Sequence, residues 1–218
     1  MFIGHYGPAL AGPRFAPVPL WMLFIAVQFL DFLWGAFIAL GIEHVRVMPG
    51  FTAMSPFDLY DMPWSHSLLM AVVWSAVLGG VWSLLARTRK RAGGLVVAAA
   101  VMSHWLADLL MHVPDLPLWP GGPQVGFGLW NNAPLTLVAE FGVLLAGWVV
   151  YMMATRAKNT VGRYGPVVLF AILAGLYWLN HVMPPPPDPV TGGLTAIALF
   201  SALSFLAWLL CDRVRVAR

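Results

Sequence analysis

Residues 93–113 read GGLVVAAAVMSHWLADLLMHV, and this stretch decides the fold class of the chain. It contains no lysine or arginine and is about as long as the roughly 20 apolar residues that carry a helix across a lipid bilayer. Its ionisable side chains, His104, Asp108 and His112, all lie in its second half. Because ionisable groups cost free energy inside a membrane, the stretch predicts a transmembrane helix that carries a functional site.

Five other stretches are long and apolar enough to span a membrane in the same way. The six predicted spans are residues 17–41, 66–86, 93–113, 134–154, 166–183 and 191–210. The sequence shows no internal repeat and no sign of a second domain. We therefore expect residues 1–218 to form a single all-α integral-membrane domain, a polytopic bundle of about six transmembrane helices.

The composition excludes several other classes of protein. Hydrophobic residues make up 60% of the chain and charged residues only 10%, whereas a soluble domain has about 25% charged residues. So few charges cannot cover a water-facing surface, which excludes a soluble enzyme. The formal net charge is +3, but no basic stripe with interleaved aromatic residues is present, so we expect no nucleic-acid partner. The single cysteine, Cys211, excludes disulfide bonds within the chain and cysteine-rich zinc sites.

The distribution of lysine and arginine predicts the orientation of the spans. If both termini are cytoplasmic, eleven of the twelve basic residues lie on the cytoplasmic side and only Arg46 lies outside. The first span is too long for the hydrophobic part of a signal peptide and is not followed by a cleavage pattern, so we expect it to be retained. The chain is thus predicted to cross the membrane several times, with both termini cytoplasmic.

The histidines and carboxylates gather near the opposite, outer face. On this topology five of the six histidines and eight of the nine carboxylates lie in the outer half of the membrane or beyond it. Ionisable side chains within spans are by default candidates for a functional site. We therefore expect these residues to converge on one pocket that faces outward.

The helix that contains His104, Asp108 and His112 presents them as one polar stripe, because residues four apart lie on the same face of an α-helix. Imidazole nitrogens and carboxylate oxygens are the ligands that zinc takes where thiolate is absent, and a His/Asp pair one turn apart can hold one ion. The alternative interpretation is a stripe that hydrogen-bonds to neighbouring helices and only stabilises their packing.

Three further residues are candidate ligands. Pro63 and the polar residues beside it are typical of a loop that delivers His66 to the start of a helix. Asp31 needs a partner in its apolar span, and a metal ion or a histidine would provide one. His5 joins the site only if the first residues fold back into the bundle, and is otherwise peripheral.

Two carboxylates are candidates for a general base. Glu140 lies in the fourth span and Asp61 in the loop before the second, and either could take a proton from water beside a metal ion. Glu140 could also be a further ligand or form an interhelical hydrogen bond. Asp61 could simply face water in a capping loop.

Four motifs follow one another along the chain: His5-Tyr6-Gly7, Asp31, Trp64-Ser65-His66-Ser67 and the His104-x-x-x-Asp108 helix. Their order resembles that of the YdjM-type membrane-bound metal-dependent hydrolases. The pattern is also distantly similar to zinc-dependent phospholipase C, in which a His-x-x-x-Asp helix helps to bind zinc ions. The resemblance covers roughly the first 130 residues. It implies hydrolase activity.

We therefore expect a membrane-embedded, metal-dependent hydrolase of a bacterial-type inner membrane, with zinc as the metal, in one or more ions. The expected ligands are His66, His104 and Asp108, and the further candidates are His5, Asp31 and His112. The expected reaction is hydrolysis of a phosphoester or related bond, and the outward position of the site points to a membrane lipid or another small molecule as substrate. The alternative is a transporter or metal-handling protein that uses the same His/Asp site. The sequence leaves the oligomeric state open.

Overall fold

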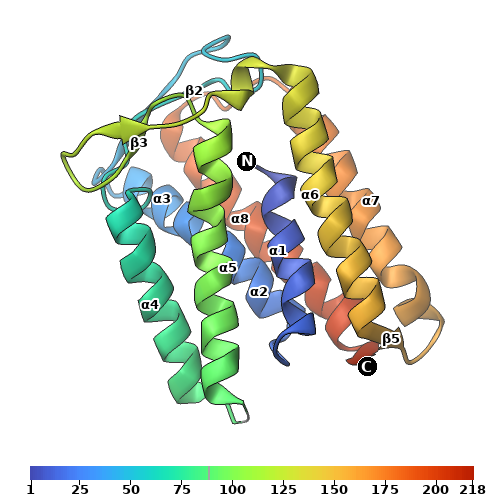
Figure 1. The fold of residues 1–218 in the computed structure, drawn as a ribbon. Coiled ribbons are helices and arrows are strands. Elements are labelled where there is room, and N and C mark those ends of the chain that lie inside the picture. Colours follow the sequence, from blue (N-terminus) through green and yellow to red (C-terminus); the bar gives the residue numbers. More distant parts are fainter. Residues whose placement is uncertain (88) are drawn as a thin grey trace.

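The computed structural model describes residues 1–87 and 89–218, and over these residues the chain forms a bundle of helices (Figure 1). Five helices are each long and apolar enough to cross a membrane. Two shorter helices joined by a sharp bend make a sixth span if they are counted as one. The predicted helical bundle with about six apolar spans is thus confirmed by length and composition, as expected for a multi-pass membrane protein.

The helices and strands keep the labels of Figure 1. The helices are α1 (Tyr6–Ala11), α2 (Leu20–Val27), α3 (Phe29–Ala39), α4 (Leu68–Leu85), α5 (Lys90–Met111), α6 (Ala133–Ala154), α7 (Thr160–Val182) and α8 (Pro189–Ala207). Short 3-10 helices cover Ile3–His5, Gly12–Arg14 and Leu129–Asn131, and a π-helical turn, Trp208–Asp212, continues α8. Three small antiparallel sheets pair β1 (His44–Val47) with β2 (Phe57–Asp61), β3 (Leu116–Pro117) with β4 (Gln124–Val125), and β5 (Thr155–Ala157) with β6 (Arg215–Ala217).

The first predicted span, residues 17–41, is not a single helix. It forms α2 and α3, which are bent by 53° at Gln28, where the backbone leaves the helical conformation. Val27, the last residue of α2, directs its carbonyl oxygen to Nδ1 of His104, 2.6 Å away. The bend therefore makes a backbone acceptor available to a side chain of another helix, and it corrects the prediction of one continuous span.

The helix α7 begins six residues before the predicted fifth span, at Thr160. Asn159 caps its first turn by accepting the N–H of Gly162. Pro166 lies inside the helix, where it cannot donate to the carbonyl of Gly162. That carbonyl accepts a hydrogen bond from the guanidinium of Arg215 at 2.6 Å, so the end of the chain satisfies the group that the proline leaves free.

The first residues fold back into the bundle, which is one of the two alternatives left open for His5. The helix α1 packs along α6. The two helices approach closely because glycines lie at the contact: a Cβ atom on Gly147 would lie 2.1 Å from the carbonyl oxygen of Gly7. Met1 is buried in the bundle, whereas the last residues lie at the other end of it (Figure 1). The α1–α6 contact thus holds Met1 inside the bundle, and the side of the membrane on which each terminus lies stays a prediction.

Two long connections lie at the upper end of the bundle as drawn in Figure 1. Residues 40–67 join α3 to α4 and contain β1 and β2, and residues 112–132 join α5 to α6 and contain β3 and β4. The lower end holds the last residues of α4, the first residues of α5 and the β5–β6 sheet. We use "upper end" and "lower end" in this sense below.

The outer faces of the long helices carry apolar side chains. Leu84 on α4, Val138 on α6 and Trp178 on α7 are each at least 69% exposed. A monomeric soluble protein rarely exposes large contiguous apolar surface, whereas a lipid-facing helix does so by necessity. The exposed faces therefore agree with a membrane environment.

Candidate metal centre

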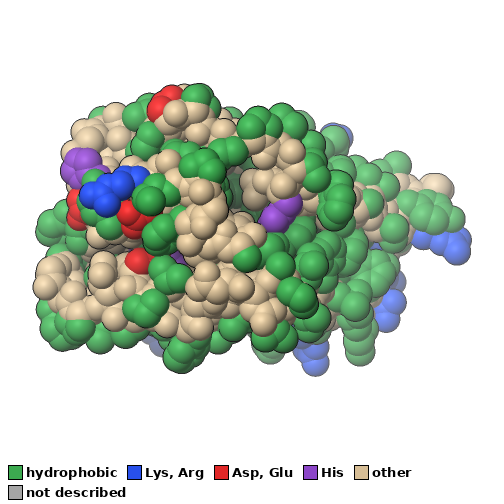
Figure 2. Space-filling view, turned by 90° about the horizontal axis from the view of Figure 1, so that it is seen from above, with side chains coloured by type: hydrophobic (Ala, Val, Ile, Leu, Met, Phe, Trp, Pro, Cys, Tyr) green, Lys and Arg blue, Asp and Glu red, His purple; other side chains and the backbone are tan. Residues whose placement is uncertain are grey.

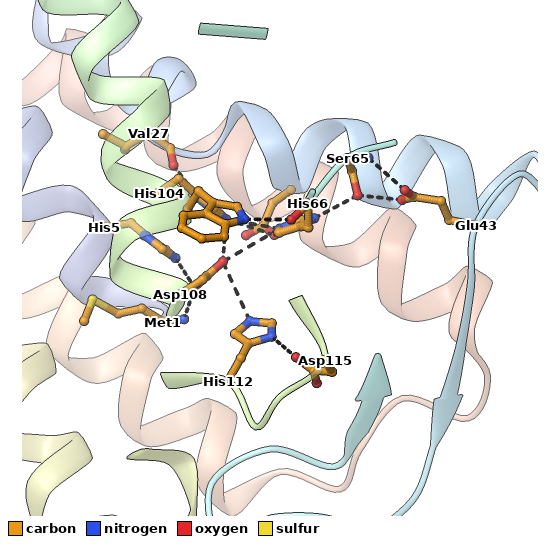
Figure 3. A network of polar contacts seen from close by, with 12 residues as sticks. Met1, His5, Val27, Glu43, Ser65, His66, His104, Asp108, His112 and Asp115 are labelled. Carbon is orange, nitrogen blue, oxygen red and sulfur yellow. Dashed lines mark hydrogen bonds and ion pairs between the residues drawn. The ribbon is translucent and has the colours of Figure 1, made fainter. Parts of the chain in front are cut away.

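Ionisable side chains from several elements converge inside the upper part of the bundle, and Figure 3 shows His66, His104 and Asp108 among them. Asp31 is on α3, His66 lies just before α4, and His104 and Asp108 are one turn apart on α5. His66, His104 and Asp108 are buried, and the side chain of Asp31 is partly exposed. Residues from three parts of the chain thus meet at one point.

Their donor atoms are separated by the distances expected around one ion. Nε2 of His104 lies 3.0 Å from Oδ2 of Asp108, 3.3 Å from Nε2 of His66 and 3.6 Å from Oδ1 of Asp31. Nε2 of His66 lies 3.4 Å from Oδ1 of Asp31 and 3.7 Å from Oδ2 of Asp108. A tetrahedral site with metal–ligand bonds of about 2.0–2.2 Å has edges of about 3.3–3.6 Å. Asp31, His66 and His104 therefore place three donor atoms 3.3–3.6 Å apart, a spacing that suits three ligands of one ion, and Oδ2 of Asp108 lies beside Nε2 of His104.

A hydrogen bond on the side of the ring that faces away from the cluster fixes the tautomer of His104. Its Nδ1 faces the carbonyl oxygen of Val27, and because a carbonyl can only accept, Nδ1 must carry the hydrogen. Nε2 then presents a lone pair to the cluster. The bend at Gln28, which turns this carbonyl toward α5, thus orients a candidate ligand.

A chain of hydrogen bonds fixes His66 in the same way. The buried carboxylate of Glu43 accepts the hydroxyl of Ser65 at 2.6 Å, which uses the only hydrogen of that hydroxyl. Oγ of Ser65, 2.8 Å from Nδ1 of His66, must therefore accept from the ring. Glu43 also accepts the backbone N–H groups of Trp64 and Ser65, which holds the loop in place. Nε2 of His66 presents a second lone pair.

Two lone pairs and two carboxylate oxygens thus face one another in a buried space. Burial removes most of the water that would solvate these groups, so they need a cation nearby: the amino group of Met1 meets Oδ1 of Asp108, and a metal ion would serve the atoms that face one another. Two imidazole nitrogens with two carboxylate oxygens form a donor set suited to zinc and similar divalent ions. The residues fit a metal ion, as the sequence predicted.

His112 lies at the edge of this cluster, directly after α5. Its Nε2 is 3.7 Å from Oδ2 of Asp108, and its Nδ1 is 2.8 Å from Oδ1 of Asp115. The ring of Trp130 covers the imidazole, with the ring centroids 4.3 Å apart. The predicted stripe of His104, Asp108 and His112 is therefore present, with a carboxylate behind its last member.

His5 reaches the cluster from the amino-terminal segment. Its Nε2 lies 3.2 Å from Oδ1 of Asp108, and its ring stacks on that of His104 with centroids 3.8 Å apart. Neither ring nitrogen has a hydrogen-bond partner among the described residues. Burial lowers the pKa of His5 to about 3, so the ring is neutral. Neutral imidazole is the form that binds metal ions.

Glu140 lies near the cluster but has other partners. One oxygen accepts the N–H of Phe2 at 2.8 Å and the other accepts the N–H of Gly4 at 2.7 Å. The carboxylate thus holds the first turn of the chain, which carries His5. The structure therefore gives Glu140 a positioning role next to the candidate ligands.

Asp61 lies apart from the cluster, on the β1–β2 hairpin. It pairs with His44 at 2.7 Å, and Arg46 pairs with Asp58 on the same hairpin at 3.2 Å. Figure 2 shows acidic, basic and histidine side chains gathered at one side of the upper surface. Asp61 therefore has a surface position, as in the interpretation that it faces water rather than acting as a general base.

A cavity of about 950 Å³ adjoins the cluster. Asp31, His66, Asp108 and His112 line one part of it, so the candidate metal centre has an open side. Residues 49–57 of the long upper connection line another part, and the facing walls come from α7 and α8. A ligand in this cavity can therefore approach the donor atoms.

Two residues with clear roles were not among the predicted site residues. Glu43 backs His66 through Ser65, and Asp115 backs His112 directly. The available signals were local, because Ser65 is adjacent to His66 and Asp115 follows His112 by three residues. The amino group of Met1 also contacts Oδ1 of Asp108, next to His5 (Figure 3).

No protein-family model, curated protein or solved structure matches this chain. Its functional assignment therefore rests on the fold and on the donor cluster. The resemblance to the YdjM-type hydrolases stays a prediction from the sequence.

Proposed function

We propose that the protein is a membrane-embedded, metal-dependent hydrolase that cleaves a phosphoester or related bond of a lipid-borne substrate. One observation carries this proposal: Nε2 of His66, Nε2 of His104 and an oxygen of Asp31 lie 3.3–3.6 Å apart beside a cavity of about 950 Å³, with a carboxylate oxygen of Asp108 3.0 Å from His104. The Nδ1 atoms of both histidines donate to groups outside the cluster, so in the neutral rings the Nε2 lone pairs are available to a metal ion. The open side toward the cavity is what a catalytic metal centre needs.

Asp31, His66 and His104 would hold the ion and leave one coordination position open, with Asp108 beside them as a further candidate ligand, and His5 would approach the second oxygen of Asp108. A bound divalent ion supplies a Lewis acid that polarises the oxygen under attack and makes water a better nucleophile near neutral pH. The chain's own groups orient the ligands through Val27 and Ser65. Zinc is the proposed ion because the donor set combines imidazole nitrogens with carboxylate oxygens.

The proton-transfer role falls to His112 rather than to Glu140 or Asp61. Both oxygens of Glu140 accept backbone N–H groups, and Asp61 is on the surface hairpin. Nε2 of His112 lies at the edge of the cavity beside Asp108, and Asp115 holds the hydrogen on Nδ1. An imidazole backed by a carboxylate is a usual arrangement for a general base.

The proposed orientation places the cluster toward the outer face of a bacterial-type inner membrane. Lys90 and Arg91 begin α5 at the lower end, whereas Asp108 lies near its upper end. Basic residues mark the cytoplasmic side of membrane proteins. This distribution supports a site at the outer face.

The metal content of the purified protein tests the proposal. Wild-type protein should carry zinc, manganese or iron, and the double variant His104→Ala with Asp108→Ala should lose it. His44→Ala, at the surface hairpin, is the matched control and should keep its metal. Metal content near zero in the wild type would refute a metal centre.

Activity separates the two functional classes. Metal-loaded protein should hydrolyse phosphodiester bonds of lipids, and the double variant should not. Movement of a metal ion or solute across vesicle membranes without any turnover of lipid would contradict a hydrolase and support a transporter.

A further inference from the structure

The cavity beside the donor cluster continues between two membrane helices. Its wall on one side carries Asp31, Asp108 and His112, and its walls on the other side include Leu176 of α7 and Leu199 of α8. One continuous space of about 950 Å³ therefore has a polar, metal-binding part and a part lined by helices that cross the membrane.

The space exists because α7 and α8 meet only toward the lower end. There the backbones touch: a Cβ atom on Gly165 would lie 2.1 Å from the carbonyl oxygen of Leu210, and one on Gly162 would lie 2.1 Å from that of Val214. Toward the upper end the two helices diverge (Figure 1), and residues 176–183 and 191–200 supply lining residues from both sides of the cavity.

The lining changes in character along the cavity. Leu176, Ala196 and Phe200 present apolar surface between the helices, while Asn180 and Thr191 lie near the upper ends of α7 and α8. Such a gradient, apolar within the membrane helices and polar near their ends, matches a molecule with a hydrocarbon part and a polar part.

The surroundings of the cavity are those of a lipid bilayer. On the outer faces of the same two helices Trp178, Val182 and Leu194 are more than half exposed. Large apolar side chains on an exposed face are typical of a helix surface in contact with lipid. The space between α7 and α8 therefore lies between helices whose outer faces suit contact with the hydrocarbon chains of lipid.

We propose that this space binds a hydrocarbon chain of a membrane phospholipid, whose phosphorylated headgroup then lies at the donor cluster. The volume is at the upper end of the range of about 300–1,000 Å³ for ligand cavities, far more than a headgroup phosphate alone needs. The placement of the headgroup rests on the proposed function. The placement of the chain rests on the cavity alone and is tested by binding, without turnover.

A cavity-filling substitution tests the chain site. Ala196→Trp puts an indole into the cavity, and Ala198→Trp, two residues along α8 at an exposed position, is the matched control. Each protein is reconstituted into nanodiscs of phosphatidylglycerol and phosphatidylcholine, and the phospholipid retained after release is counted by native mass spectrometry. Wild type and the control should retain about one phospholipid per chain. Ala196→Trp should retain about tenfold less, with unchanged zinc content.

Two results would overturn the proposal. The first is retention by Ala196→Trp equal to that of the wild type at equal zinc content. The second is retention of phospholipid by the wild type no stronger than retention of glycerol phosphate, which has no chain. If Ala196→Trp does not fold, Leu176→Trp fills the cavity from α7 and takes its place.

Hydrolysis is measured separately, so that the two proposals can fail independently. Loss of retention in Ala196→Trp together with no lipid hydrolysis by the metal-loaded wild type would support the chain site and refute the hydrolase. Lipid hydrolysis by the metal-loaded wild type together with unchanged retention in Ala196→Trp would refute the chain site and leave the hydrolase standing.

Discussion

Three histidines of the cluster each donate a ring N–H to a different kind of acceptor. His104 donates to a backbone carbonyl, His66 to a serine hydroxyl, and His112 to a carboxylate. The hydrogen bond behind a ligating imidazole sets its tautomer, its orientation and its basicity. At the scale of single residues, the groups behind the ligands therefore decide the properties of the centre as much as the ligands do.

Replacing Ser65 by alanine cuts the link between His66 and Glu43. We expect metal affinity to fall by about 10- to 100-fold, because the imidazole loses the acceptor that orients it. Competition with a chromogenic chelator measures the affinity. Ser201→Ala, at an exposed serine of α8, is the control. An affinity unchanged in Ser65→Ala would mean that His66 does not bind the metal through Nε2.

Replacing Asp115 by asparagine weakens the partner of His112 without touching the four candidate ligands. We expect the rate of hydrolysis to fall by about 10²- to 10⁴-fold, the usual contribution of a general base, at unchanged metal content. Asp61→Asn should leave the rate unchanged, because Asp61 lies on the surface hairpin. Steady-state assays and metal analysis on the same samples check both variants. A rate that falls in Asp61→Asn and is unchanged in Asp115→Asn would instead support Asp61 as the general base, as the sequence suggested.

At the scale of elements, contacts between small residues bring the helices close enough to form the centre. Gly7 on α1 touches Gly147 on α6, and Gly35 on α3 touches Gly193 on α8. Membrane helices associate through such contacts, because lipid offers no hydrophobic driving force for their packing. The first pair places His5, and the second holds the helix that carries Asp31.

Replacing Gly147 by leucine should push α1 away from α6. We expect a loss of stability of about 1–3 kcal/mol, typical of overpacking, together with weaker metal binding because His5 moves with α1. Gly142→Leu is a matched control on the same helix, since a Cβ atom there meets no atom within 4 Å. Thermal unfolding in detergent and chelator competition measure the two effects. Equal behaviour of the two variants would contradict the close α1–α6 contact.

At the scale of the whole molecule, the centre joins α3, α5 and the segments before α1 and α4. Metal that binds only the folded protein stabilises it according to its concentration and affinity. At about 1,000 times the dissociation constant this amounts to roughly 4 kcal/mol.

Removal of the metal should therefore lower the melting temperature of the protein. We expect a chelator to lower it in the wild type, and zinc added back in excess to restore it. His104→Ala should melt at the same temperature with and without zinc. Differential scanning fluorimetry in detergent follows each case. A melting temperature that does not respond to metal in the wild type would argue against binding at this centre.

The spans could be predicted because hydropathy acts locally, residue by residue, in a bilayer. The bend at Gln28 could not, since neither proline nor glycine marks it and its partner, His104, is far along the chain. The return of His5 into the bundle depends on a contact between Gly7 and Gly147, which no local pattern encodes.

The candidate site could also be predicted in part, because some of its residues stand out in the local sequence. Asp31, His104 and Asp108 are ionisable residues within apolar stretches, and such residues are conspicuous. Glu43 and Asp115 lie in the connections, where carboxylates are common and ordinarily face water. Only the tertiary structure shows that both are buried behind histidines.

The three different acceptors behind His66, His104 and His112 also make the three imidazoles distinguishable. A ring N–H bonded to a carboxylate, to a hydroxyl and to an amide carbonyl has three different magnetic environments, so nuclear magnetic resonance should resolve three separate far-downfield proton signals. Each signal would follow the occupancy of the centre from one identified position. The protein thus contains its own set of spectroscopic reporters.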